Sequence, residues 1–164
     1  MNRLVRHLLL LVLFALLQIF VFKDLGWWHA VPLLYVYALL VWPADTPLWL
    51  QLTAAFVLGM LIDLASDTPG MNAAATVFAA FVRPWLLNVF SASDDARFSP
   101  GEHTMGFVPF WKYALSLVLI HHTALFLLES WSLIPFFLIV LRILTSVFLT
   151  SLLIWFCERF RRQS

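Results

Sequence analysis

Charged residues are scarce in this sequence. Only 12% of its 164 residues are Asp, Glu, Lys or Arg, about half the share of a typical soluble domain, whereas 63% are hydrophobic. A globule of this length cannot bury so much apolar surface. The formal net charge of +1 gives no strongly basic surface, so nucleic acid is not an expected partner. The composition therefore predicts an integral membrane protein whose apolar surface is largely covered by lipid.

Cysteine and catalytic motifs are also missing or nearly so. The single cysteine, Cys157, excludes an internal disulfide and a cysteine-based zinc site. The sequence has no G-x-S-x-G motif, no H-E-x-x-H motif and no glycine-rich phosphate loop. Asp63 and Asp67 are too close in sequence to form the two separate arms of an intramembrane aspartate protease. We therefore expect no enzymatic activity, no cofactor and no metal.

Long apolar runs, in contrast, are abundant. A helix needs roughly 20 apolar residues to cross the hydrocarbon core of a bilayer. The first run follows two arginines, as in a signal peptide, but no small-residue cleavage site comes after it, so we interpret it as a retained helix. The second run is short and contains Pro32, which is disfavoured inside a helix. The six predicted spans cover about residues 5–22, 27–42, 48–65, 71–90, 110–129 and 133–156.

Positive charges predict how these spans are oriented. With six spans, one side of the membrane receives seven Lys and Arg residues, and the other side receives only Lys23. Short loops rich in Lys and Arg stay in the cytoplasm, so both termini and the polar loop 91–109 are predicted to be cytoplasmic. A five-span arrangement would move one set of terminal arginines outside. We therefore expect residues 1–164 to form one all-α membrane domain, a compact bundle of six transmembrane helices.

Small and polar residues share one face of the third predicted span. Ala55, Gly59 and Asp63 are spaced by four, and the small side chains at the first two positions allow another helix backbone to approach closely. Gly70 lies in the turn that follows, and Asn72 begins the next span. This stretch is either a packed helix pair with a satisfied carboxylate, or a partner-binding or conformational site at the outer surface.

Two arginines lie within predicted spans, where a charge is costly and needs a partner. Arg83 precedes Pro84, which removes a backbone hydrogen bond and tends to kink a helix. The arginine could bond a freed carbonyl or extend to the cytoplasmic headgroups. Arg142 is predicted near mid-depth and should point into the bundle. Asp63 is its first expected partner, and Glu129 is the second.

Two histidines and an acid lie toward the end of the fifth predicted span. His122 and Glu129 are seven residues apart and share one helix face, with His121 beside them. A metal site needs three or four converging ligands, and the sequence offers no further ligand nearby. We therefore expect polar packing, or contact with a partner helix, in place of metal binding.

Several of these residues together carry a family resemblance. Gly59 and Asp63, followed by Gly70 and Ala73, resemble the G-x-x-x-D…G-x-x-A signature of the rod shape-determining protein MreD family. Residues 81–84 (Phe-Val-Arg-Pro), 120–122 (Ile-His-His) and 127–129 (Leu-Leu-Glu) are similar to one branch of that family. The resemblance covers about residues 50–160, while the first fifty residues are generic.

The resemblance implies a function and a set of partners. MreD proteins are non-enzymatic components of the bacterial cell-elongation machinery in the inner membrane, and act with MreC, with RodA and its transpeptidase partner, and with the MreB filament. Their fold is similar to the six-helix substrate-binding subunits of energy-coupling-factor vitamin transporters. The expected function is a scaffold that helps maintain cell shape by linking MreC and peptidoglycan synthases to the cytoskeleton, with membrane lipid as a further partner.

The same fold similarity supplies an alternative function. The chain could be a small-molecule-binding subunit of a vitamin-type transporter, which would need an outward pocket lined by polar and aromatic groups. A buried cluster of Asp63, His122, Glu129 and Arg142 would provide such a pocket. Duplicated halves, which many transporters show, are not evident in the sequence.

Overall fold

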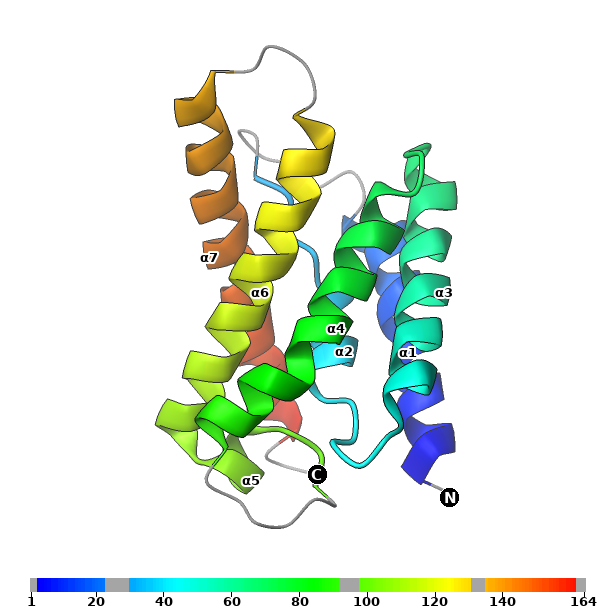
Figure 1. Ribbon diagram of the computed structural model, residues 1–164, viewed down its shortest axis with the longest axis vertical. Helices are drawn as coiled ribbons and strands as arrows, with labels where there is room; N and C mark the ends of the chain where they lie inside the picture. The colour runs from blue at the N-terminus through cyan, green and yellow to red at the C-terminus, as the bar shows by residue number, and fades with distance from the viewer. Residues whose placement is uncertain (1–2, 23–29, 92–97, 131–134, 162–164) are drawn as a thin grey trace.

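A bundle of long helices forms the body of the protein (Figure 1). The computed structural model describes residues 3–22, 30–91, 98–130 and 135–161, so Lys23, loop residues 92–97 and the predicted helix boundaries near 27 and 133 lie outside the described residues. Within the described ranges, every regular element is helical. The elements are α1 (Arg3–Leu17), η1 (Gln18–Phe22), α2 (Val36–Leu40), α3 (Leu48–Ser66), α4 (Met71–Phe90), α5 (Glu102–Met105), α6 (Phe107–Glu129) and α7 (Phe136–Arg161).

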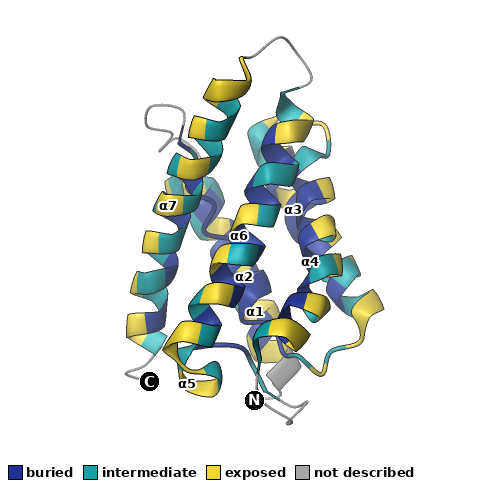
Figure 2. Cartoon of the chain, turned by 60° about the vertical axis from the view of Figure 1, so that its left-hand side comes forward, coloured by how far each residue is buried: buried dark blue, intermediate teal, exposed yellow. Residues whose placement is uncertain are grey.

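Five stretches of the described chain are long and apolar enough to cross a membrane. They are α1 with its π-helical continuation η1, and the helices α3, α4, α6 and α7. Buried residues face the middle of the bundle and exposed residues face outward (Figure 2). The outward residues include large apolar side chains such as Leu64, Phe148 and Phe160, which are 72%, 70% and 70% exposed. So large an apolar exterior is unfavourable in water and indicates a multi-pass membrane protein.

The second predicted span differs from the expectation. Residues 30–42 do not form a membrane-length helix, and only the short α2 is helical within them. Pro32 contributes to this difference, because it lacks the N–H that a helix needs and restricts the residue before it. Apart from Val31, every residue of 30–42 is buried, and Figure 1 shows the segment running inside the bundle toward the end where α1 begins.

Side chains from α7 and η1 replace the hydrogen bonds that a helix would make internally. Non-helical backbone is tolerated at membrane depth only where it is enclosed by protein that satisfies its polar groups. The bonds are Val31 N–H to Ser146 Oγ (2.9 Å), Leu33 N–H to Thr150 Oγ1 (3.0 Å), Leu34 N–H to Gln18 Oε1 (2.8 Å) and Gln18 Nε2–H to Pro32 O (3.0 Å). The segment is therefore built into the core as an irregular strap.

The helices pack around this strap in a defined order. α4 lies between α3 and α6, and α7 packs on the other side of α6. α1 contacts α2, α3 and its own continuation η1. The start of α1, the end of α7 and the short α5 all lie at one end of the bundle, which we call the terminal end (Figure 1). The α3–α4 turn lies at the opposite end.

Candidate functional site

The α3–α4 turn is held by the carboxylate of Asp63. Asp63 is 2% exposed, and its Oδ1 accepts hydrogen bonds from the Thr68 hydroxyl and from both the backbone N–H (3.0 Å) and the side-chain amide (3.0 Å) of Asn72. Its Oδ2 accepts the backbone N–H of Ala73 (2.8 Å). The first N–H groups of a helix lack intrahelical partners and attract negative charge. Asp63 therefore caps α4 from the neighbouring helix.

Gly59 brings the two helix backbones together one turn earlier. A Cβ built on Gly59 would lie 2.4 Å from Ala73 Cα and 2.7 Å from its backbone nitrogen, which no side chain could tolerate without moving α4. Ala55 is buried on the same face. Gly70 has a φ of +79°, a conformation in which L side chains are strained, and turns the chain into α4. The close helix contact predicted from the spacing is present.

A buried hydrogen-bond chain continues from this turn to the strap. The Tyr35 hydroxyl donates to Asn72 Oδ1 (3.1 Å) and lies 3.0 Å from His121 Nε2. Thr76 Oγ1 donates to the carbonyl of Asn72 (2.6 Å). Because the single Tyr35 proton is used by Asn72, His121 Nε2 must carry a proton and donate to the Tyr35 oxygen. His121 Nδ1 has no hydrogen-bond partner among the described residues.

His122 connects α6 to α7 and the strap. Its Nδ1 lies 2.8 Å from the carbonyl of Val118 and therefore carries the proton, since a carbonyl oxygen can only accept. Its Nε2 then accepts from Thr150 Oγ1 (3.2 Å), and the same hydroxyl accepts the N–H of Leu33. Glu129, seven residues further along α6, pairs with Arg142, for which it was the second expected partner. Within the described residues, no group of three His, Cys, Asp or Glu side chains converges as a metal site would require.

Arg83 holds the far end of the strap. It is fully buried, and its guanidinium donates to the Tyr113 hydroxyl (2.9 Å), to Gln51 Oε1 (2.9 Å) and to the carbonyls of Leu40 (3.4 Å) and Trp42. Those carbonyls lie at the C-terminal end of α2, where a cation is favourable. Extension to the headgroups, one of the two predicted roles, is therefore wrong, and Arg83 does bond carbonyls, although not one that Pro84 frees.

The carbonyls that Arg83 binds belong to the strap. They do not come from the turn of α4 that Pro84 frees. Pro84 itself lies inside α4, which continues on both sides of it from Met71 to Phe90. Arg83 and Pro84 therefore contribute separately to the structure.

Arg142 corrects a second expectation. Its Nη1 lies 2.7 Å from Glu129 Oε2, and its guanidinium lies over the Phe126 ring, 4.3 Å from the centroid. Asp63, the first expected partner, uses both oxygens on α4. Arg142 is six residues after Phe136, where α7 begins, so it lies about 9 Å along the helix. Its side chain is 27% exposed, so the bundle encloses it only in part.

Sequence reasoning missed a buried acid near the end of α7. Glu158 is 1% exposed and accepts from the Tyr37 hydroxyl (2.7 Å) and the backbone N–H of Glu102 (3.1 Å), and it pairs with Arg161 (3.1 Å). A signal was present, because the buried residues of α7 repeat every four positions. They are Ser146, Thr150, Ile154 and Glu158. Extending the spacing recognised at Ser146 and Thr150 would have found Glu158.

A small pocket lies at the end of the bundle that carries the α3–α4 turn. It has a volume of about 220 Å³, and its polar lining includes Gln18, Thr68, Asn72 and Glu129. Of the four residues expected to form a ligand pocket, Glu129 lines it, whereas Asp63, His122 and Arg142 do not. The structure therefore does not bring that predicted cluster together.

Comparison with models of known protein families, with curated proteins and with solved structures finds no match. The buried polar side chains of the described residues satisfy backbone groups by hydrogen bonding. Asp63 binds the start of α4, and Arg83 binds the end of α2. Thr150 binds the strap and is itself bonded to His122. Groups arranged in this way fix the relative positions of helices.

Proposed function

We propose that this chain is a non-enzymatic membrane scaffold of the bacterial cell-elongation complex, similar in role to MreD proteins. It would link MreC and the peptidoglycan synthases, RodA and its transpeptidase partner, to the MreB filament. The observation that carries the proposal is the Asp63 cap. The residues of the MreD-like signature, Gly59, Asp63, Gly70 and Ala73, meet at one buried helix joint, as expected for a motif that maintains an architecture.

The proposed placement is the bacterial inner membrane with both termini in the cytoplasm. The seven-to-one bias of Lys and Arg supports this orientation, because the terminal end of the bundle would then carry most of the positive charge. The strap would serve as the sixth pass, since it continues inside the bundle from the η1 side toward the terminal end. Five lipid-facing helices and one enclosed segment would then complete the six-pass topology.

Co-purification with MreC and rescue of rod shape test this proposal. The tagged chain would be expressed with MreC in a rod-shaped bacterium that lacks its own MreD. We expect MreC to co-purify and the cells to regain rod shape. Leu64→Ala, at a lipid-facing position of α3 that is 72% exposed, should behave like the wild type, whereas Gly59→Leu should lose both effects. A well-folded wild-type chain that neither binds MreC nor restores shape would contradict the proposal.

A vitamin-type transporter subunit is the second candidate function. The pocket of about 220 Å³ is the feature that favours it, because five of its lining residues are polar. Sites for small molecules usually have volumes of about 300–1,000 Å³, so the pocket is small for a vitamin. Thermal stabilisation of the purified chain by a panel of vitamins, with Asn72→Ala as a variant of the pocket wall, would favour this candidate over the scaffold.

A further inference from the structure

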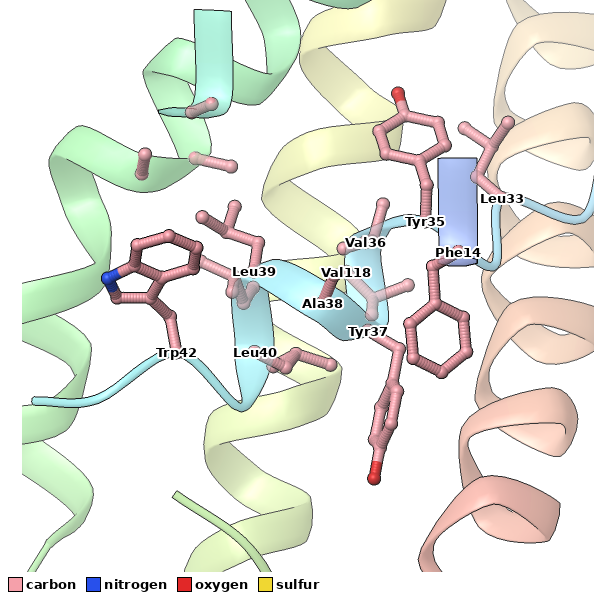
Figure 3. Packing of buried hydrophobic residues seen from close by; sticks show 14 of the residues in the cluster. Phe14, Leu33, Tyr35, Val36, Tyr37, Ala38, Leu39, Leu40, Trp42 and Val118 are labelled. Carbon is pink, nitrogen blue, oxygen red and sulfur yellow. The ribbon is translucent and has the colours of Figure 1, made fainter. Parts of the chain in front are cut away.

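A larger cavity lies at the terminal end, between α1 and α7. It has a volume of about 780 Å³, within the usual range for sites that bind small molecules. Its walls are mainly apolar and include Leu10 and Phe14 from α1, Val41 from the strap, and Phe98 and Phe160. Tyr37 forms part of the inner wall, and Figure 3 shows its ring beside Phe14. The cavity therefore offers an apolar slot at one end of the bundle.

The helix packing explains why this space is open. α1 packs on α2 and α3, while α7 packs on α6, so the first and last long helices meet mainly through the strap between them. Both flanking helices expose apolar residues on their outer faces, including Leu9 and Leu13 of α1 and Phe156 of α7. In a membrane these faces are in contact with acyl chains. The cavity thus adjoins surfaces that lipid already covers.

Two arginines give the cavity a positive lining. Arg161 donates twice to the carbonyl of Pro100 (3.0 Å each) and pairs with Glu158 (3.1 Å). Arg6 is exposed and makes no hydrogen bond or ion pair with any residue that the structure describes. None of the described lining residues is acidic, and Glu158 behind the wall already has three partners. An anion at Arg6 would therefore meet no opposing carboxylate.

We propose that this cavity holds one acyl chain of an anionic phospholipid, whose phosphate is bound by Arg6 with Arg161 beside it. The apolar walls would cover the chain, and the guanidiniums at the membrane surface would bind the headgroup. A free phosphate ion would leave the apolar walls without a partner. This lipid site is independent of the proposed scaffold function.

Lipid retention measured by native mass spectrometry tests the site. The purified chain would be reconstituted in nanodiscs of phosphatidylcholine and phosphatidylglycerol and then released into mild detergent. We expect the wild type to retain one phosphatidylglycerol in preference to phosphatidylcholine. Arg6→Gln should reduce this retention about fivefold, the effect of one arginine at a membrane surface. Arg159→Gln is the matched control, because Arg159 lies over the Trp155 ring and does not line the cavity.

Cys157 supplies a second measurement, because this half-buried thiol lines the cavity. Phosphatidylglycerol should slow its labelling by an N-alkyl maleimide in the wild type, and less so in Arg6→Gln. Leu10→Trp, which fills the cavity without changing its charge, should abolish preferential retention while the thermal unfolding midpoint stays within a few degrees. Equal retention of both lipids, protection of Cys157 by inorganic phosphate alone, or wild-type retention in a folded Leu10→Trp would each overturn the proposal.

Discussion

Two pairs of helices in this bundle meet in opposite ways. α3 and α4 approach until the backbone of Ala73 fills the space beside Gly59, and a carboxylate with four donors closes the turn between them. α1 and α7 leave a cavity of about 780 Å³. The difference follows from side-chain size, because Ala55 and Gly59 line the first joint and Phe14 and Phe160 the second gap. Small residues and one buried charge allow α3 and α4 to pack closely. Large residues and surface charges leave a gap between α1 and α7 that a lipid can fill.

The strap connects these two regions through two tyrosines. Tyr35 donates to Asn72 at the α3–α4 joint, and Tyr37 donates to Glu158 behind the cavity. Figure 3 shows the two side chains pointing in opposite directions from one short stretch of the strap. Because both bonds involve one short stretch of backbone, a shift of the strap would alter the closed joint and the open gap together. The predictions that follow separate the contributions of the two regions.

Gly59→Leu should have the largest effect on stability. The new side chain would overlap the backbone of α4, and backbone cannot move aside as a flexible side chain can. We expect a loss of about 3 kcal/mol or more, at the upper end of overpacking effects, measured by unfolding in detergent. Leu64→Ala on the lipid-facing side of α3 is the control and should change stability little. A normally stable Gly59→Leu protein would show that the joint is looser than described.

Asp63→Asn should come next, with a loss of about 3 kcal/mol. The substitution removes the charge and replaces one acceptor oxygen by an amide donor that faces the N–H groups of α4, leaving buried donors unsatisfied. Asp67→Asn is the matched control at the same turn. Asp67 is exposed and has the left-handed conformation (φ 53°), which asparagine also tolerates. The stability of the Asp67→Asn protein should therefore stay within about 0.5 kcal/mol of the wild type. Equal effects at both positions would remove the special role of the cap.

Tyr35→Phe and Tyr37→Phe compare the two regions directly. Both changes delete one hydroxyl, but Tyr35 is fully buried, and its change would leave Asn72 Oδ1 without a donor among the described residues. Glu158 would keep two other partners beside the cavity. We expect a loss of about 2 kcal/mol for Tyr35→Phe and about 1 kcal/mol for Tyr37→Phe. Chemical unfolding of both variants in the same detergent measures the difference, and the reverse order would contradict the contrast between closed and open regions.

The long helices could be predicted from the sequence, but the strap could not. Hydropathy located four of them within a few residues, as with 48–65 for α3 and 71–90 for α4, because each must be apolar over a membrane length. Hydropathy also predicts a helix at 27–42. It indicates that a segment has apolar surroundings, but not which groups form hydrogen bonds with its backbone. In the strap, backbone N–H groups donate to the side chains of Gln18, Ser146 and Thr150, which are distant in sequence. The local signals of the difference were Pro32 and the shortness of the run.

The candidate site divides in a similar way. The Ala55, Gly59 and Asp63 face was predictable because spacing by four defines a helix face without reference to other helices. The partners of Arg83 and Arg142 depend on which helices are neighbours and on how deep each residue lies, and spacing says nothing of either. The position of Arg142 along α7 determines its partner. It is close enough to the start of α7 to form an ion pair with Glu129 at the end of α6.

The smallest expected effect concerns that ion pair, outside both compared regions. Arg142 and Glu129 are 27% and 22% exposed, so water and salt weaken their attraction, and partly exposed pairs contribute about 0–1 kcal/mol. A double-mutant cycle with Glu129→Gln and Arg142→Gln should therefore give a coupling below about 1 kcal/mol that falls as salt is added. The cycle with Asp63→Asn and Arg142→Gln should be additive, because Asp63 bonds only to the α3–α4 turn and α4 among the described residues. A coupling of several kcal/mol between Asp63 and Arg142 would require α7 to approach the α3–α4 joint, and would remove the distinction between the joint and the rest of the bundle.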